Sequence, residues 1–120
     1  MLNRLSCLCI VGSSLLFLSA GASAATFDGR WEAQAKTDSG RCRDEYTFNL
    51  EVAGDRVSGS VQGKQGSYLL AGVVNKEGAT EIELRGPDPG VFRGTFKDDS
   101  GGGEWETRRC KGTFQLKRAN

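Results

Sequence analysis

The sequence predicts an all-β fold, a small eight-stranded antiparallel up-and-down barrel. Three observations lead to this prediction. Apolar and polar residues alternate with a period of two, which is typical of half-buried strands and not of helices. Turn-forming residues separate these runs at short and even intervals. Glycine is also abundant, at 17 of 120 residues, which suits tight turns and strongly bent strands.

Eight runs of residues qualify as strands. The second is the clearest, because Tyr46, Phe48, Leu50 and Val52 alternate with polar residues. Clusters of Gly, Asp, Asn and Pro separate the runs, and we interpret residues 98–103 as one long turn of this kind. The expected strands span residues 30–37, 43–52, 56–62, 67–74, 79–85, 91–97, 103–108 and 111–118.

Closure into a barrel is indicated by glycines that lie two residues before large apolar side chains. The pattern occurs, for example, from Gly29 to Trp31, from Gly94 to Phe96 and from Gly112 to Phe114. An inward-facing glycine beside a large side chain lets a short strand coil strongly enough to close a barrel. Closure also removes exposed sheet edges. The alternative architecture is a β-sandwich.

The N-terminus has the organisation of a signal peptide. A short region with one positive charge precedes the uncharged apolar residues 5–18, and small residues follow. Residues 22–24, Ala-Ser-Ala, match the pattern of a signal peptidase site, so we expect cleavage after Ala24. About 14 apolar residues are short for a bilayer span, which needs about 20, so a retained anchor is the weaker alternative. We expect a signal peptide over residues 1–24, one barrel domain over residues 25–120, and a periplasmic or secreted mature chain without membrane insertion.

Cysteine usage predicts one disulfide. Of the four cysteines, Cys7 and Cys9 lie in the expected signal peptide, which leaves Cys42 and Cys110. Two cysteines in an oxidising compartment have one intramolecular pairing. Closing a loop of about seventy residues stabilises a domain by about 4 kcal/mol in the chain-entropy model. A free redox pair and an intermolecular bridge are the alternatives, but no CxxC spacing or neighbouring histidine activates either thiol.

The charge balance restricts the class of partner. The chain has 16 basic and 15 acidic residues, and loss of Arg4 with the signal peptide leaves 15 of each. Nucleic acids and anionic membranes normally select a basic surface. We therefore expect neither as a partner.

Histidine is absent from the chain, and this excludes several chemistries. Neither a Ser-His-Asp nor a Cys-His nucleophile can form, and imidazole cannot ligate zinc, copper or haem. We therefore expect no metal, no cofactor and no enzymatic activity. A carboxylate-based hydrolase is the remaining catalytic alternative, since Glu81 and Glu83, and likewise Glu104 and Glu106, share a strand face. A solvated outer face balanced by nearby arginines is the simpler interpretation of both pairs.

Short motifs at both ends of the expected domain resemble known barrel proteins. The segment Phe27 to Trp31, Phe-Asp-Gly-Arg-Trp, resembles the Gly-x-Trp opening of lipocalin-like and avidin-like (calycin-type) barrels. With an early cysteine, Gly-Glu-Trp at Gly103 to Trp105 and Cys-Lys-Gly-Thr-Phe at Cys110 to Phe114, the layout resembles a set of small exported bacterial single-disulfide β-barrel proteins of unknown function. The resemblance spans most of residues 27–118 and implies a fold more than a function.

Aromatic residues are the main candidates for a ligand site. An eight-stranded barrel is just wide enough to be filled by side chains or to hold one small ligand, and a cavity of about 300 Å³ or more would favour the ligand. Trp31 is expected to plug the floor of the barrel. Tyr46 and Tyr68 are candidates to line an opening, because buried tyrosine hydroxyls need polar partners. Trp105 and Arg108 complete the candidate site, with Arg108 and Arg109 able to bind a carboxylate or phosphate, or simply to be exposed charges.

The function expected from these features is non-enzymatic binding by an exported monomer. Its partner would be a small apolar or amphipathic molecule, or an exported protein, held by the barrel mouth and loops. The alternative is a periplasmic inhibitor of a protease or another hydrolase, since small exported inhibitors with eight-stranded barrels are similar in size and in the Gly-x-Trp opening. In that case Pro87 and Pro89 would rigidify the loop and present Asp88 to the partner.

Overall fold

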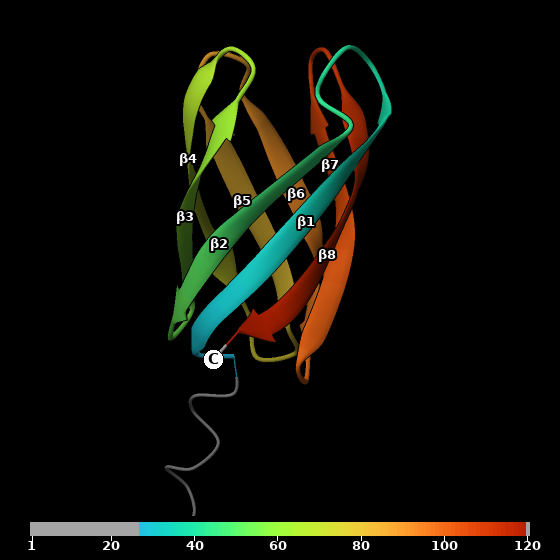
Figure 1. Ribbon diagram of the computed structural model, residues 1–120. Coiled ribbons are helices and arrows are strands. Elements are labelled where there is room, and N and C mark those ends of the chain that lie inside the picture. Colours follow the sequence, from blue (N-terminus) through green and yellow to red (C-terminus); the bar gives the residue numbers. More distant parts are fainter. Residues whose placement is uncertain (1–26, 120) are drawn as a thin grey trace, which may run out of the picture.

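The eight expected strands all form, and each pairs antiparallel with the next strand along the chain. The computed structural model describes residues 27–119 (Figure 1), so the expected signal peptide, residues 1–24, lies outside the described residues. Because β8 also pairs with β1, the sheet closes into a barrel, which confirms the predicted fold in preference to the sandwich. The strands are β1 (Gly29–Ser39), β2 (Glu45–Ala53), β3 (Arg56–Gly63), β4 (Gly66–Val74), β5 (Ala79–Arg85), β6 (Gly90–Lys97), β7 (Ser100–Thr107) and β8 (Lys111–Ala119).

The largest error in the predicted boundaries is at β7, which begins at Ser100 and not at residue 103. The turn before it consists of Asp98 and Asp99, with Asp98 in the left-handed region at a φ of 54°. The glycines that follow belong to the strand and pair with both β6 and β8. A Cβ atom on Gly101 would lie 3.1 Å from Leu116 Cδ1, so this glycine makes room for the core of the barrel. The prediction of a turn over residues 98–103 was wrong because a glycine run also occurs where strands must approach closely.

Alternation places one face of each strand in the core, as the sequence predicts. In β2, for example, Phe48, Leu50 and Val52 are at most 7% exposed, and the polar residues between them are exposed. Thr80 also faces inward, and its hydroxyl donates a hydrogen bond to the carbonyl of Val73 at 2.7 Å, so the buried polar group is satisfied.

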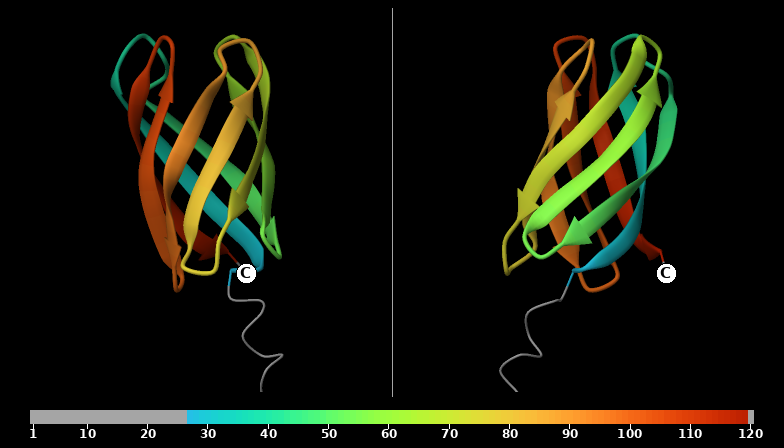
Figure 2. Two further views of the ribbon diagram at one scale, coloured as in Figure 1. Left: turned by 180° about the vertical axis from the view of Figure 1, so that it is seen from behind. Right: turned by 90° about the vertical axis from the view of Figure 1, so that its left-hand side faces the viewer.

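The up-and-down strand order places alternate connections at opposite ends of the barrel (Figures 1 and 2). We call one end the mouth: it carries the β1–β2, β3–β4, β5–β6 and β7–β8 connections and is at the top of Figure 1. The opposite end, the floor, carries the other connections and the C-terminal end of β8. No helix in the part of the chain that the structure describes is long and apolar enough to cross a membrane.

The floor is closed by Trp31, where the sequence predicts a plug. Its side chain is fully buried, and its ring meets Phe96 edge-on with the ring centroids 4.8 Å apart. The indole N–H donates to the carbonyl of Phe27 at 2.9 Å, which satisfies its one donor. The guanidinium of Arg118 lies 4.6 Å from the centroid of the indole and also donates to Asp99 Oδ1 at 3.0 Å. The floor therefore holds a packed and hydrogen-bonded cluster.

Candidate binding site at the barrel mouth

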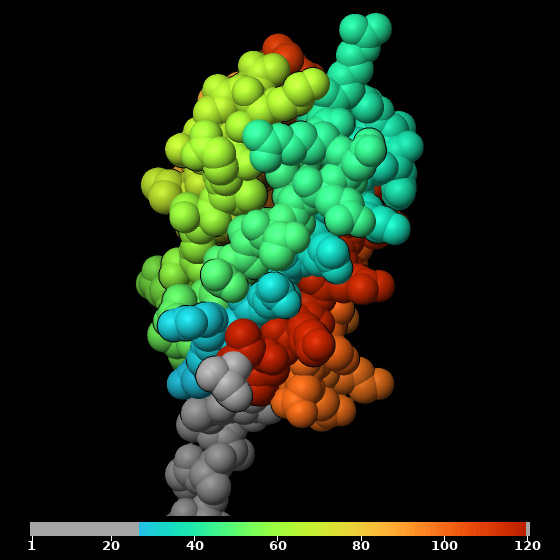
Figure 3. All heavy atoms as spheres, in the orientation of Figure 1, coloured from blue at the N-terminus to red at the C-terminus, as the bar shows by residue number. Residues whose placement is uncertain are grey.

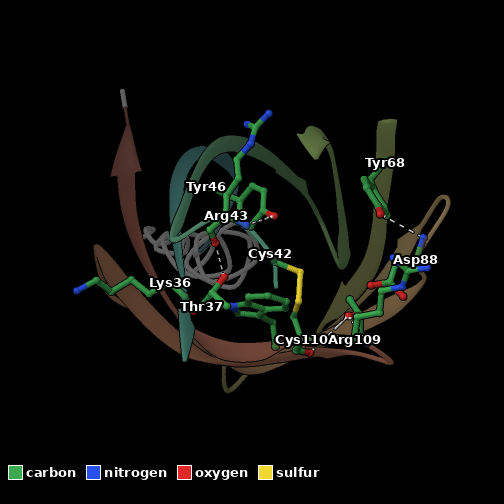
Figure 4. Close-up of a disulfide and its surroundings, with 11 residues drawn as sticks. Lys36, Thr37, Cys42, Arg43, Tyr46, Tyr68, Asp88, Arg109 and Cys110 are labelled. Atoms are coloured by element: carbon green, nitrogen blue, oxygen red, sulfur yellow. Dashed lines mark hydrogen bonds between the residues drawn. A yellow bond between two sulfur atoms is a disulfide. The ribbon is translucent and has the colours of Figure 1, made fainter. Parts of the chain in front are cut away.

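The predicted disulfide forms at the mouth and joins two of its connections (Figure 4). Cys42 belongs to the β1–β2 connection and Cys110 to the β7–β8 connection, and their Cα atoms are 6.3 Å apart. Gly40 makes the approach possible, because its φ is +103° and a Cβ there would collide with the backbone of Arg109 and with Cys110. The bridge therefore ties the first hairpin of the barrel to its last strand.

Hydrogen bonds hold both bridged connections in place. In the β7–β8 connection the backbone N–H of Cys110 donates to Thr107 Oγ1 at 3.0 Å, and that of Arg109 does so at 3.2 Å. In the β1–β2 connection the N–H of Arg43 donates to the hydroxyl of Tyr46 at 3.0 Å. The mouth is thus built from ordered hairpin ends.

A cavity of about 90 Å³ lies beneath the disulfide and reaches into the barrel. Its volume is well below the roughly 300 Å³ of common ligand pockets, so side chains fill most of the interior. A space of this size suits a few waters or one small ring. Aromatic and aliphatic side chains form most of its walls, and polar residues of the connections surround its opening. Its lining residues include Tyr46, Phe48, Val61, Tyr68, Phe92, Trp105, Arg41, Lys64, Asp88 and Arg109.

The aromatic wall is a set of interlocked rings centred on Phe92. Phe92 lies edge-on to Phe48, with centroids 5.8 Å apart, and stacks near Trp105 at 6.1 Å. Trp105 in turn meets Tyr46 edge-on at 6.4 Å. Each ring is held by the next, so the cavity keeps an apolar and polarisable wall without a ligand.

Gly112 allows Trp105 to take its place in this wall. The indole N–H of Trp105 donates to the carbonyl of Lys36 on β1 at 3.0 Å. A Cβ on Gly112 would collide with that same carbonyl oxygen and lie 2.8 Å from Trp105 Nε1. The glycine of the Cys-Lys-Gly-Thr-Phe motif therefore leaves the space in which the hydrogen bond forms.

The structure brings three of the four candidate ligand-binding residues together. Tyr46, Tyr68 and Trp105 all line the cavity. Arg108 is exposed on the β7–β8 connection and is not among the lining residues, whereas its neighbour Arg109 lines the opening.

The β5–β6 connection differs from the expected presentation of Asp88. Pro87 and Pro89 are exposed, but Asp88 is only 7% exposed and lines the cavity. The reason is the hydroxyl of Tyr68, which accepts a hydrogen bond from the backbone N–H of Asp88 at 3.1 Å and draws the loop inward (Figure 4). Asp88 therefore belongs to the cavity wall and does not protrude from the loop.

The paired carboxylates lie on the outer wall of the barrel. Glu81 accepts a hydrogen bond from Arg93 Nε at 2.9 Å, and Glu83 accepts one from Arg85 Nη2 at 2.9 Å. Glu104 and Glu106 are exposed on β7. Among residues 27–119, no group of three or more His, Cys, Asp and Glu side chains lies close enough to hold a metal ion.

Arg41 and Lys64 line the cavity but were not candidates from the sequence. Each lies in a short connection, where a basic residue carries no pattern of its own. The predicted strand order could have indicated both residues. In an up-and-down barrel, residues of the first and third connections must lie at the same end.

A larger depression of about 1270 Å³ lies near the floor, between β4, β5 and β6, the β2–β3 connection and Phe27. Its walls include the ion-paired side chains of Glu81 and Arg93 and the residues of the β4–β5 turn. It is more open to solvent than the mouth cavity. The mouth cavity is therefore the better candidate site.

Fold and site together define a class: closed eight-stranded antiparallel barrels with one disulfide across the mouth. Among solved structures, the chain is similar to one described as "De novo design of a fluorescence-activating beta barrel". The two are 17% identical, the match covers 81% of this chain and 97% of that chain, and the TM-score is 0.54. This likeness shows the fold alone. No protein-family model and no curated protein matches the chain.

Proposed function

We propose that this chain is an exported, non-enzymatic binding protein that holds a small apolar or amphipathic molecule in the mouth cavity. The observation that supports this most is the asymmetry of the core. The floor is filled by Trp31 and its neighbours, whereas the mouth end keeps a cavity of about 90 Å³ with an aromatic wall. A concave, mostly apolar lining with a few polar groups is typical of small-molecule sites, although this cavity is smaller than most of them.

The size of the cavity restricts the ligand. About 90 Å³ admits a single aromatic ring or a short alkyl group and excludes a long acyl chain without rearrangement of the walls. The inhibitor alternative has less support, because Asp88, the residue expected to contact a protein partner, faces the cavity. A relationship to calycin-type barrels is part of the proposal and is supported by the Gly-x-Trp opening with Trp31 at the floor.

Filling the cavity should abolish binding of a neutral aromatic probe. We expect 2-phenylethanol to bind wild-type protein, and Val61→Phe to weaken it at least about tenfold, because the added ring occupies the space that Val61 borders. Ser60→Tyr adds a ring to the exposed outer face of the same strand and should change the affinity less than twofold. A titration with 2-phenylethanol followed by NMR measures the affinities of both variants. Equal affinity in the wild type and in Val61→Phe, or no binding to the wild type, would contradict the proposal.

Export has its own test. When the full chain is expressed in a bacterium, the mature protein should begin at Ala25, because residues 22–24 match a signal peptidase site. The intact mass of the protein from the periplasmic fraction measures this. Ala24→Arg should block processing. An unprocessed wild-type chain that stays in the cytoplasm would refute export.

A further inference from the structure

The near-zero net charge of the chain conceals an uneven distribution of charge between the connections at the two ends of the barrel. The connections at the mouth carry five basic residues against two acidic ones, Asp44 and Asp88. The floor connections, together with residues 27–28, carry one basic residue, Lys76, against five acidic ones. The basic mouth residues are Arg41, Arg43, Lys64, Arg108 and Arg109, and the acidic floor residues are Asp28, Asp55, Glu77, Asp98 and Asp99. In Figure 3 the β1–β2 connection (teal) and the β3–β4 connection (yellow-green) stand at the upper end, on this basic rim.

Three of the basic residues, Arg41, Lys64 and Arg109, border the cavity itself. Within residues 27–119, no hydrogen bond or ion pair engages the side chain of any of the three. Four arginines elsewhere on the barrel differ, because each of them makes an ion pair with a carboxylate. These four are Arg30, Arg85, Arg93 and Arg118. The cationic groups at the cavity are therefore available to a ligand.

We propose that the mouth cavity selects small aromatic carboxylates. The inference rests on the proposed function and adds the charge of the ligand. The ring of the ligand would lie against Trp105 and Phe92, and its carboxylate would reach Arg41 and Arg109 at the opening. Guanidinium groups bind carboxylates through paired N–H donors, and a basic rim raises the local concentration of anions.

Asp88 would favour a cationic ligand over an anionic one. It is the only acidic residue among the described residues that line the cavity, it is 7% exposed, and no hydrogen bond or ion pair engages its carboxylate within the described chain. A buried carboxylate beside aromatic rings attracts an ammonium group. Three cations border the same space, however, so the net field at the opening favours an anion. Asp88 then opposes anion binding, and its removal should strengthen it.

Three probes with nearly the same body and different charge separate these possibilities: phenylacetate, 2-phenylethanol and 2-phenylethylamine. By isothermal titration calorimetry at 20 mM NaCl, we expect phenylacetate to bind about tenfold more tightly than the alcohol, and the amine to bind more weakly than either. At 300 mM NaCl the advantage of phenylacetate should fall to about threefold, because salt screens exposed charges. The affinity for the alcohol should not change with salt.

Variants assign the effect to the residues at the cavity. Arg41→Gln/Arg109→Gln should lower the affinity for phenylacetate about tenfold, to that of the alcohol, and leave the alcohol within twofold. Arg108→Gln removes a charge from the same connection without touching the cavity and should change both affinities less than twofold. Asp88→Asn should raise the affinity for phenylacetate about threefold and lower that for the amine.

The outcomes distinguish this inference from the proposed function. If 2-phenylethanol does not bind, the proposed function fails and the inference fails with it. If the alcohol binds and phenylacetate binds no more tightly, only the inference is overturned. The inference is also overturned if the amine binds more tightly than phenylacetate. The same holds if Arg108→Gln lowers the affinity for phenylacetate as much as Arg41→Gln/Arg109→Gln does.

Discussion

Trp31→Ala should lower the free energy of unfolding by about 3–5 kcal/mol, the usual cost of truncating a buried tryptophan. Trp31 is fully buried, packs edge-on against Phe96 and lies under the guanidinium of Arg118. Small domains are stable by about 5–15 kcal/mol in total, so this one change removes a large share. Urea denaturation followed by circular dichroism measures the loss.

Trp31→Phe is the matched control for this prediction. It keeps a ring against Phe96 and loses the hydrogen bond to the carbonyl of Phe27, so we expect a cost of about 1–2 kcal/mol. If Trp31→Ala does not fold, this milder variant still gives a measurable value. A loss below about 1 kcal/mol in a folded Trp31→Ala protein would show that the floor is not a packed plug.

Loss of the disulfide should have the second-largest effect. Cys42→Ser/Cys110→Ser should lower the free energy of unfolding by about 2–4 kcal/mol, because the bridge closes a loop with a sequence separation of 68 and restricts the unfolded chain. For a domain of this size the melting temperature should fall by roughly 10–25 °C. Scanning calorimetry measures the shift.

Reduction of the unmodified protein provides the control for the serine variant. It breaks the same bond without placing a serine hydroxyl at the buried position 110, so both samples should lose stability to a similar extent. An unchanged melting temperature after complete reduction would show that the bridge does not stabilise the barrel. A loss in the serine variant alone would assign the effect to the substitution at the buried site.

The strands were predictable from the sequence because in a small barrel each strand has one face in the core and one in water. That is why the alternation in Tyr46 to Val52 locates β2 correctly to within two residues. The glycine run in β7 was not predictable in the same way. A glycine has no side chain to show which face it is on, so Gly101 in a strand and a glycine in a turn look alike.

The site was only partly predictable, for physical reasons that differ between residues. Tyr46, Tyr68 and Trp105 follow from alternation and from the need of their polar groups for partners. The inward position of Asp88 depends on one hydrogen bond from its backbone to Tyr68, across 20 residues of sequence, which no local pattern encodes. The volume of the cavity depends on how the rings around Phe92 tilt, and composition does not determine that.

The central claim is that a small molecule binds at the mouth and not at the floor, and the two tryptophans allow a direct test. Trp105 lines the mouth cavity, whereas Trp31 is buried in the floor cluster, and each has one indole N–H. In a ¹H–¹⁵N NMR titration with 2-phenylethanol, the indole resonance of Trp105 should shift with a saturating dependence on ligand concentration, and that of Trp31 should stay in place. A shift of Trp31 with none at Trp105, or no shift of either, would contradict the account.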